Sequence, residues 1–118
     1  MAKAVPLTID QGSTWIVVIT LKSASGAWDL TGHTLRMQIR ESAQSSTIIA
    51  SPACTVTDAT NGKIQVKLTA AQTAAISATG KGYSNVTEYY YDLEMENSSG
   101  TVWRLINGPC YVSPEVTK

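Results

Sequence analysis

The segment from Glu88 to Glu96 alternates strictly between apolar and polar side chains. Its apolar positions are Tyr89, Tyr91, Leu93 and Met95, and its polar positions are Glu88, Tyr90, Asp92, Glu94 and Glu96. A period of two places these two sets on opposite faces of a β-strand. The pattern predicts a strand that buries one face and exposes a face that is almost wholly acidic.

Two further segments alternate in the same way but carry basic residues at their polar positions. They run from Leu35 to Arg40 and from Lys63 to Leu68. Opposite charges across a strand pair contribute roughly 0.2–1 kcal/mol each and help to select the register. We predict that the acidic strand and both basic strands are neighbours in one antiparallel sheet. The alternative is that each polar face is an ordinary solvated face.

Other strand-like runs follow one another at short intervals, separated by turn residues. The chain has 118 residues, which is enough for one hydrophobic core without metals or disulfides. We therefore predict a single domain over residues 1–118, with an all-β, mainly antiparallel fold: a β-sandwich of about seven to nine short strands. A small closed barrel has the same alternation and stays open as an alternative.

Local signals place one helix and several turns. Thr69-Ala70-Ala71-Gln72 fits a capping box and predicts one short helix near residues 70–78, with Gly80 as its stop. Asn61-Gly62 predicts a hairpin with a two-residue turn. Asn107-Gly108-Pro109 predicts a break before a last strand at Cys110–Val112.

The charge and the cysteines limit the partners and the compartment. Nine basic and nine acidic residues cancel, so the composition favours neither a nucleic-acid nor a membrane partner. The first residues lack the apolar stretch of a signal peptide. We therefore expect a protein that is made in a cytoplasm, with Cys54 and Cys110 as separate buried thiols rather than a disulfide.

The residues needed for catalysis or for binding a cofactor are largely missing. The chain has a single histidine, His33, and its two cysteines do not form a CxxC motif. It has neither a glycine-rich phosphate loop nor a GxSxG turn. We predict no enzymatic activity, no cofactor and no metal site. Asp92 and Glu94 share a strand face and offer a hydrolase reading, but any polar strand face has this spacing.

The aromatic residues are the candidates for an interface. The phase of the strands places Trp15 and Tyr91 in the core, whereas Trp28 lies in a turn-rich loop and Tyr90 on the acidic face. Tryptophan and tyrosine combine an apolar body with a polar tip and are enriched at protein contacts. We predict Trp28, Tyr90 and Trp103 as interface residues, or alternatively as residues that stack on a sugar ring.

Four stretches, in order along the chain, resemble a known family. They are Ile9–Trp15, Trp28–Arg40, Tyr91–Glu94 and Gly108–Pro114. Together they resemble small bacteriophage tail proteins related to the N-terminal domain of siphophage upper baseplate proteins. The resemblance implies a β-sandwich module of the virion, a tail, baseplate or tail-fibre adapter that acts by contact with other virion proteins. Because virion proteins often act in symmetric copies, we also expect a homo-oligomer, such as a trimer or a ring. A capsid decoration protein and a carbohydrate-binding module are the alternatives.

Overall fold

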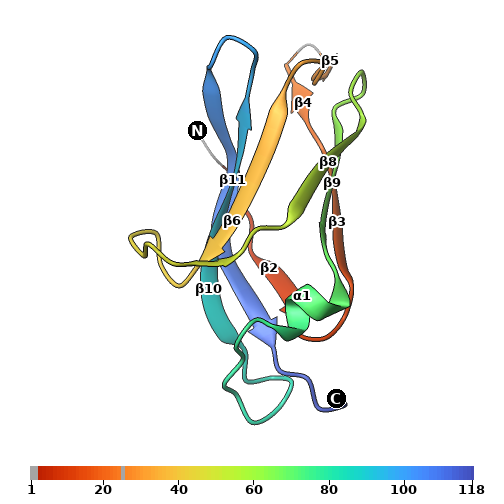
Figure 1. The fold of residues 1–118 in the computed structure, drawn as a ribbon. Helices are drawn as coiled ribbons and strands as arrows, with labels where there is room; N and C mark the ends of the chain where they lie inside the picture. The colour runs from red at the N-terminus through yellow and green to blue at the C-terminus, as the bar shows by residue number, and fades with distance from the viewer. Residues whose placement is uncertain (1–2, 25) are drawn as a thin grey trace.

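The computed structural model describes residues 3–24 and 26–118, which form two β-sheets packed face to face (Figure 1). The six-stranded sheet holds β1 (Lys3–Ala4), β2 (Leu7–Asp10), β6 (Thr34–Arg40), β7 (Ile48–Ala50), β10 (Thr87–Glu96) and β11 (Val102–Ser113). Its order is β1-β11-β10-β6-β7, with β2 also paired to β11. The three-stranded sheet holds β3 (Trp15–Thr20), β8 (Ala53–Asp58) and β9 (Lys63–Leu68) in the order β3-β9-β8.

A short hairpin of β4 (Lys22–Ser23) and β5 (Gly26–Ala27) completes the strands of the described residues. Eight of these strands have three residues or more, and the other three have two. The predicted all-β sandwich of short, mainly antiparallel strands is confirmed. No helix in the described ranges has the length and apolar character that a membrane span requires.

The core lies between the two sheets and uses the alternating positions that the sequence indicates. Leu93 and Met95 of β10 are fully buried, and Ile64 and Val66 of β9 face them from the smaller sheet with at most 1% exposure. Trp15 is also buried against this core. The predicted burial of Trp15 and Tyr91 is therefore confirmed, with exposed fractions of 9% and 5%.

The predicted pairing of the acidic strand with two basic strands is half right. β10 lies antiparallel to β6 with Glu94 opposite Arg36, so the first pairing is confirmed. The second is wrong, because Lys63–Leu68 forms β9 in the other sheet, between β3 and β8. Exposed charge pairs contribute too little to decide which sheet a strand joins, whereas β9 is placed where its apolar face packs against that of the six-stranded sheet.

The predicted helix exists but is shorter than residues 70–78. α1 spans Ala70–Ala74, and its capping box is present: the Gln72 amide donates to Thr69 Oγ1 over 3.2 Å, and the Thr69 amide donates to Gln72 Oε1 over 2.8 Å. Only Thr73 of the helix is buried. Because the alanine-rich segment offers no repeating apolar stripe, packing does not stabilise a second turn, and the chain leaves the helix to bury Ile76.

The hairpin between β8 and β9 has a four-residue loop, residues 59–62, instead of the predicted two-residue turn. A two-residue type I′ turn needs a positive φ at both central residues. Gly62 has a φ of 69°, but no described non-glycine residue has a positive φ, so Asn61 does not fit that turn.

The predicted break at Asn107–Pro109 is also wrong, because β11 continues through it to Ser113. β1 and β2 both run parallel to β11 in one common register, with Ala4 beside Asn107 and Leu7 beside Cys110. Only the Val5-Pro6 link interrupts this edge, and the Val5 amide donates to the Asn107 carbonyl over 2.8 Å. The N-terminal segment thus supports β11 past its proline. Cys54 and Cys110 are free thiols, half-buried and buried respectively.

Candidate functional site

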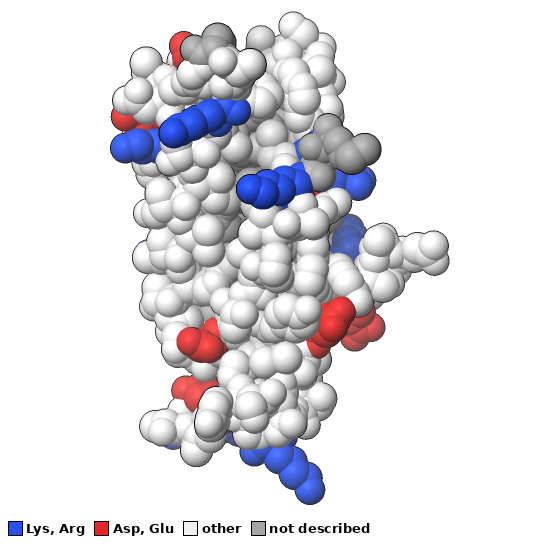
Figure 2. All heavy atoms as spheres, turned by 180° about the vertical axis from the view of Figure 1, so that it is seen from behind, with Lys and Arg blue, Asp and Glu red and all other residues white. Residues whose placement is uncertain are grey.

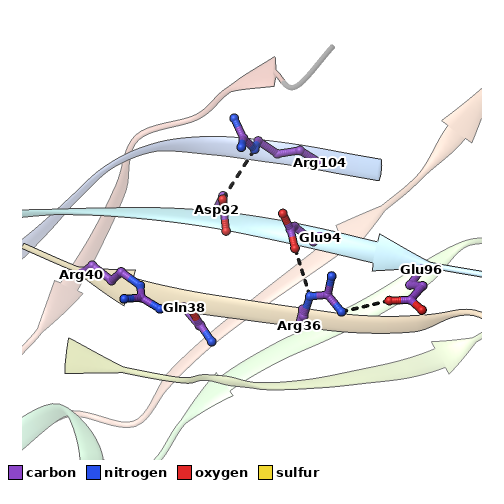
Figure 3. Close-up of polar contacts among 7 residues, drawn as sticks. All are labelled: Arg36, Gln38, Arg40, Asp92, Glu94, Glu96 and Arg104. Carbon is purple, nitrogen blue, oxygen red and sulfur yellow. Dashed lines mark hydrogen bonds and ion pairs between the residues drawn. The ribbon is translucent and has the colours of Figure 1, made fainter. Parts of the chain in front are cut away.

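The outer face of the six-stranded sheet carries charges of both signs in neighbouring rows (Figure 3). Arg36 of β6 lies between two carboxylates of β10: its Nε is 3.0 Å from Glu94 Oε1, and its Nη1 is 3.1 Å from Glu96 Oε1. On the other side of β10, Arg104 Nε of β11 lies 3.5 Å from Asp92 Oδ2. The acidic strand is therefore flanked by an arginine on each neighbouring strand.

Contacts with carboxylates raise the pKa of two groups on the outer face, Arg36 and Tyr90. Hydrogen bonds to Glu94 and then to Glu96 raise the pKa of Arg36, because each carboxylate favours the charged guanidinium. Tyr90 donates its hydroxyl to Glu88, and this hydrogen bond raises the pKa of Tyr90. At neutral pH, Arg36 is therefore charged and the Tyr90 phenol is neutral.

A groove of about 820 Å³ runs over this face. Residues of β6, β10 and β11 line it, and so do residues 42–44 of the β6–β7 loop. The loop projects from the side of the sheet, as Figure 1 shows. The lining side chains of the strands include Gln38, Arg40, Tyr90, Asp92, Glu94 and Arg104.

Arg40 fixes the loop against the sheet. Its Nη1 donates to the Ser45 carbonyl over 2.7 Å, and its Nη2 donates to Gln38 Oε1 over 2.8 Å. Both Nη atoms of this guanidinium therefore help to hold the loop against the sheet. The groove combines an exposed tyrosine with arginines and carboxylates, which is a lining suited to polar contacts with another molecule.

The structure separates the three predicted interface residues. Tyr90 lines the groove and is 41% exposed. Trp28 and Trp103 lie together elsewhere, in a T-shaped contact with ring centroids 5.7 Å apart, and both pack against the core. Trp103 is opposite the buried Met95 and thus on the inner side of the sheet, whereas Tyr90 is on the outer face. The ring of His33 lies 5.9 Å from Trp103.

Sequence reasoning missed Arg104 and the part of the groove that the β6–β7 loop lines. The alternation of Leu35–Arg40 marks Arg40 and Gln38 as outward-facing, and this signal was available. Arg104 gave no such signal, because a bulge between Leu93 and Glu94 shifts the register of β11 against β10. The position of the β6–β7 loop is a tertiary property that its small polar residues do not encode.

The hydrolase reading of Asp92 and Glu94 gains no support from the geometry. Each carboxylate forms an ion pair with its own arginine on a different neighbouring strand, so the two are not arranged as a pair around a common substrate position. Within residues 3–24 and 26–118, no cluster of three or more histidine, cysteine, aspartate or glutamate side chains is placed to hold a metal ion.

Comparisons with known proteins give one family match. The model of the BppU N-terminal domain matches residues 7–86, which is more than half of the chain. No curated protein matches the chain. This match includes β6 and the β6–β7 loop of the groove, whereas β10 and β11 follow it.

Two solved structures align over most of their length. A structure of murine CRIg aligns with a TM-score of 0.40 and 8% identity, covering 94% of this chain and 92% of that chain. A structure from photo-crosslinking analyses of multimeric cell-adhesive interactions of VGSC beta subunits aligns with a TM-score of 0.42 and 13% identity, covering 95% and 93%. Both TM-scores are too low to carry an argument about fold or function.

Proposed function

Because this chain belongs to the BppU N-terminal domain family, we propose that it is a non-enzymatic baseplate or tail-fibre adapter of the phage virion. The family match over residues 7–86 carries this proposal. The chain acts as one β-sandwich domain over residues 1–118 and works through contacts with other tail or baseplate proteins. In the virion it is present in several symmetric copies, as closed assemblies of identical subunits are the common arrangement.

The groove on the outer face is the surface we assign to the contact with a tail or baseplate protein. Tyr90 supplies an exposed ring there, and tyrosine is enriched among the residues that dominate binding at protein interfaces. Arg104 and Asp92 offer a donor and an acceptor beside it. A partner segment with both acidic and basic side chains complements this lining.

The first test asks where the protein is in the virion. Gold-labelled antibody against this chain, viewed on intact phage by electron microscopy, is expected to mark the baseplate or the tail-fibre attachment. Label spread over the head would support the capsid decoration alternative instead. Absence of the protein from purified virions would contradict both structural roles.

The second test concerns the groove. Tyr90→Ala is expected to weaken co-purification with the tail and baseplate proteins by tenfold or more, because truncation of a residue that dominates an interface costs about 2 kcal/mol or more. Tyr83→Ala is the matched control, since Tyr83 is 79% exposed and does not line the groove. Equal binding by both variants would remove the groove from the interface.

Sugar binding is a second candidate, favoured by the exposed Tyr90 ring beside hydrogen-bonding side chains. Trp28 and Trp103 are less suited to stacking on a sugar, because each is half-buried and contacts the other edge to face. Calorimetric titration with common cell-surface saccharides separates the two functions. A binding heat that the wild-type protein shows and Tyr90→Ala does not would favour sugar binding. The absence of a binding heat with every saccharide tested would rule it out.

A further inference from the structure

β3 is an edge strand without the usual protection. It pairs with β9 on one side, and the described part of the chain places no strand against its other side. Natural edge strands are normally blocked by a charged residue, a proline, a bulge or a covering segment, because a free edge pairs with other chains. The six residues Trp15–Thr20 include no charge, proline or glycine, and their register with β9 runs without a shift.

The outward side chains of β3 are also apolar. Ile16 is 50% exposed and Val18 is 66% exposed, both on the face away from the core. Their neighbours on β9 are Lys67 and Gln65, so the same face of the sheet becomes polar one strand further in. Apolar side chains are therefore placed at the free edge, where a further strand would cover them.

The two ends of β3 differ in charge. Lys22 follows its carboxyl end, where Thr20 also pairs with Lys63. At its amino end, Asp10 is exposed, and the Glu115 carboxylate packs on Gly12, in the space that a Cβ would take. Figure 2 shows the molecule from behind: uncharged surface fills much of the middle, and both basic and acidic groups occur toward the top and toward the bottom.

We propose that β3 pairs antiparallel with β3 of a second copy of this chain, so that two three-stranded sheets become one continuous sheet. This inference rests on the proposed assembly function and names the surface that joins the copies. With Val17 at the two-fold axis, Ile16 lies opposite Val18 of the partner subunit. The four outward side chains of the two strands then form one apolar cluster.

The charges at the strand ends select a second copy in this orientation. In the same register, Lys22 comes opposite Gly12 of the partner subunit, where the partner's Glu115 packs. The basic end of each copy thus meets the acidic end of the other, twice by symmetry. A parallel arrangement would instead bring Lys22 of the two copies together and forfeit this complementarity.

The first measurement is the mass of the full chain in solution, by light scattering and sedimentation across a concentration series. We expect a reversible dimer in the wild-type protein. Val18→Lys is expected to be monomeric at the same concentrations, because it places a lysine in the apolar cluster of each copy. Val102→Lys is the matched control, since Val102 is 44% exposed on β11 and is expected to leave the dimer intact.

A charge-pair variant tests the register. In Ile16→Glu/Val18→Lys, each new glutamate faces a new lysine of the other copy, so the double variant should recover dimerisation that Val18→Lys alone loses. Circular dichroism confirms that each variant is folded. A wild-type monomer throughout the series, or a dimer that persists in Val18→Lys, would overturn the proposal, and failure of the double variant to recover would overturn its register.

The result of the dimerisation test can be distinguished from the results of the virion tests. The wild-type mass decides the first step whether or not a variant folds. A chain that is monomeric yet still labels the baseplate and binds through Tyr90 overturns the β3 contact and leaves the adapter function standing. A dimer absent from virions supports the contact and counts against the adapter.

Discussion

Arg36 and Glu94 stand opposite each other on β6 and β10, with Arg36 Nε 3.0 Å from Glu94 Oε1, although 58 residues separate them in the sequence. Both side chains lie on the outer face, partly open to solvent. The contact therefore contributes more to the choice of register than to the stability of the fold.

Exchanging the two charges tests this role. Arg36→Glu should lower the melting temperature at low salt, because it places a third carboxylate beside Glu94 and Glu96. The loss should shrink in 1 M NaCl, where the Debye length falls from about 10 Å to about 3 Å. Adding Glu94→Arg should recover part of the loss. Lys67→Glu, in the other sheet, is the control, and its effect should not change when Glu94→Arg is added.

The sequence predicted the faces of the strands better than their neighbours. Alternation shows that Ile64, Val66 and Leu68 are buried, but it does not show against which sheet, so the sequence-based prediction places Lys63–Leu68 in the wrong one. The pairing of β10 with β6 was predictable because the charges of both strands are exposed and opposite. β11 was not predicted as one strand, since the support from β1 and β2 at Gly108-Pro109 comes from the other end of the chain.

The candidate site was predictable only where it lies on a regular strand. Tyr90 follows from its phase in Glu88–Glu96. The rest of the groove depends on a bulge that aligns Arg104 with Glu94 and on a loop that Arg40 holds through Ser45. Neither has a local sequence signal, because each is a consequence of tertiary packing.

Thr73 is a second structural link that mutagenesis can test. Its hydroxyl is fully buried, donates to the Ser13 carbonyl over 2.8 Å and accepts from the Gly12 amide over 3.0 Å. Thr73→Val keeps the shape but leaves both backbone groups without this partner, so the free energy of unfolding should fall by about 1–3 kcal/mol. Urea denaturation measures the change. Thr57→Val, on an exposed strand face, is the control and should cost much less.

Two glycines with a similar backbone separate conformational strain from steric clash. Gly62 and Gly100 have φ values of 69° and 87°. A Cβ on Gly62 would lie 2.5 Å from the Leu21 carbonyl oxygen, whereas a Cβ on Gly100 would meet nothing within 4 Å. Gly100→Ala should therefore lower the free energy of unfolding only by the cost of the left-handed conformation, about 1–2 kcal/mol. Gly62→Ala should lower the free energy of unfolding clearly more in the same urea titration. Equal losses for the two variants would show that the loop moves away from the added Cβ at no energetic cost.

Two thiols and a phenol, each buried or half-buried, predict how the stability depends on alkaline pH. Burial raises the pKa of the Cys110 thiol from 9.0 to about 12 and that of Cys54 to about 11, and it raises the pKa of Tyr91 from 10.0 to about 12. In each case the fold favours the neutral, protonated form. The unfolded chain therefore loses these protons at lower pH than the folded chain does. The contribution of these groups to the free energy of unfolding should be fully present below pH 9. It should be lost as the pH rises toward 12.

Two variants assign this loss to its groups. Cys110→Ala should show a weaker fall of the urea midpoint above pH 9, even though the lost side chain lowers the whole curve. Tyr91→Phe should weaken the fall at a higher pH than Cys110→Ala does, around pH 10 and above, because the unfolded tyrosine is half ionised at pH 10. Tyr83→Phe, at an exposed position, is the control for removing a tyrosine hydroxyl as such. The slope isolates the buried proton from the packing of the side chain, so a Cys110→Ala curve parallel to the wild-type curve would show that this thiol ionises at the same pH in both states.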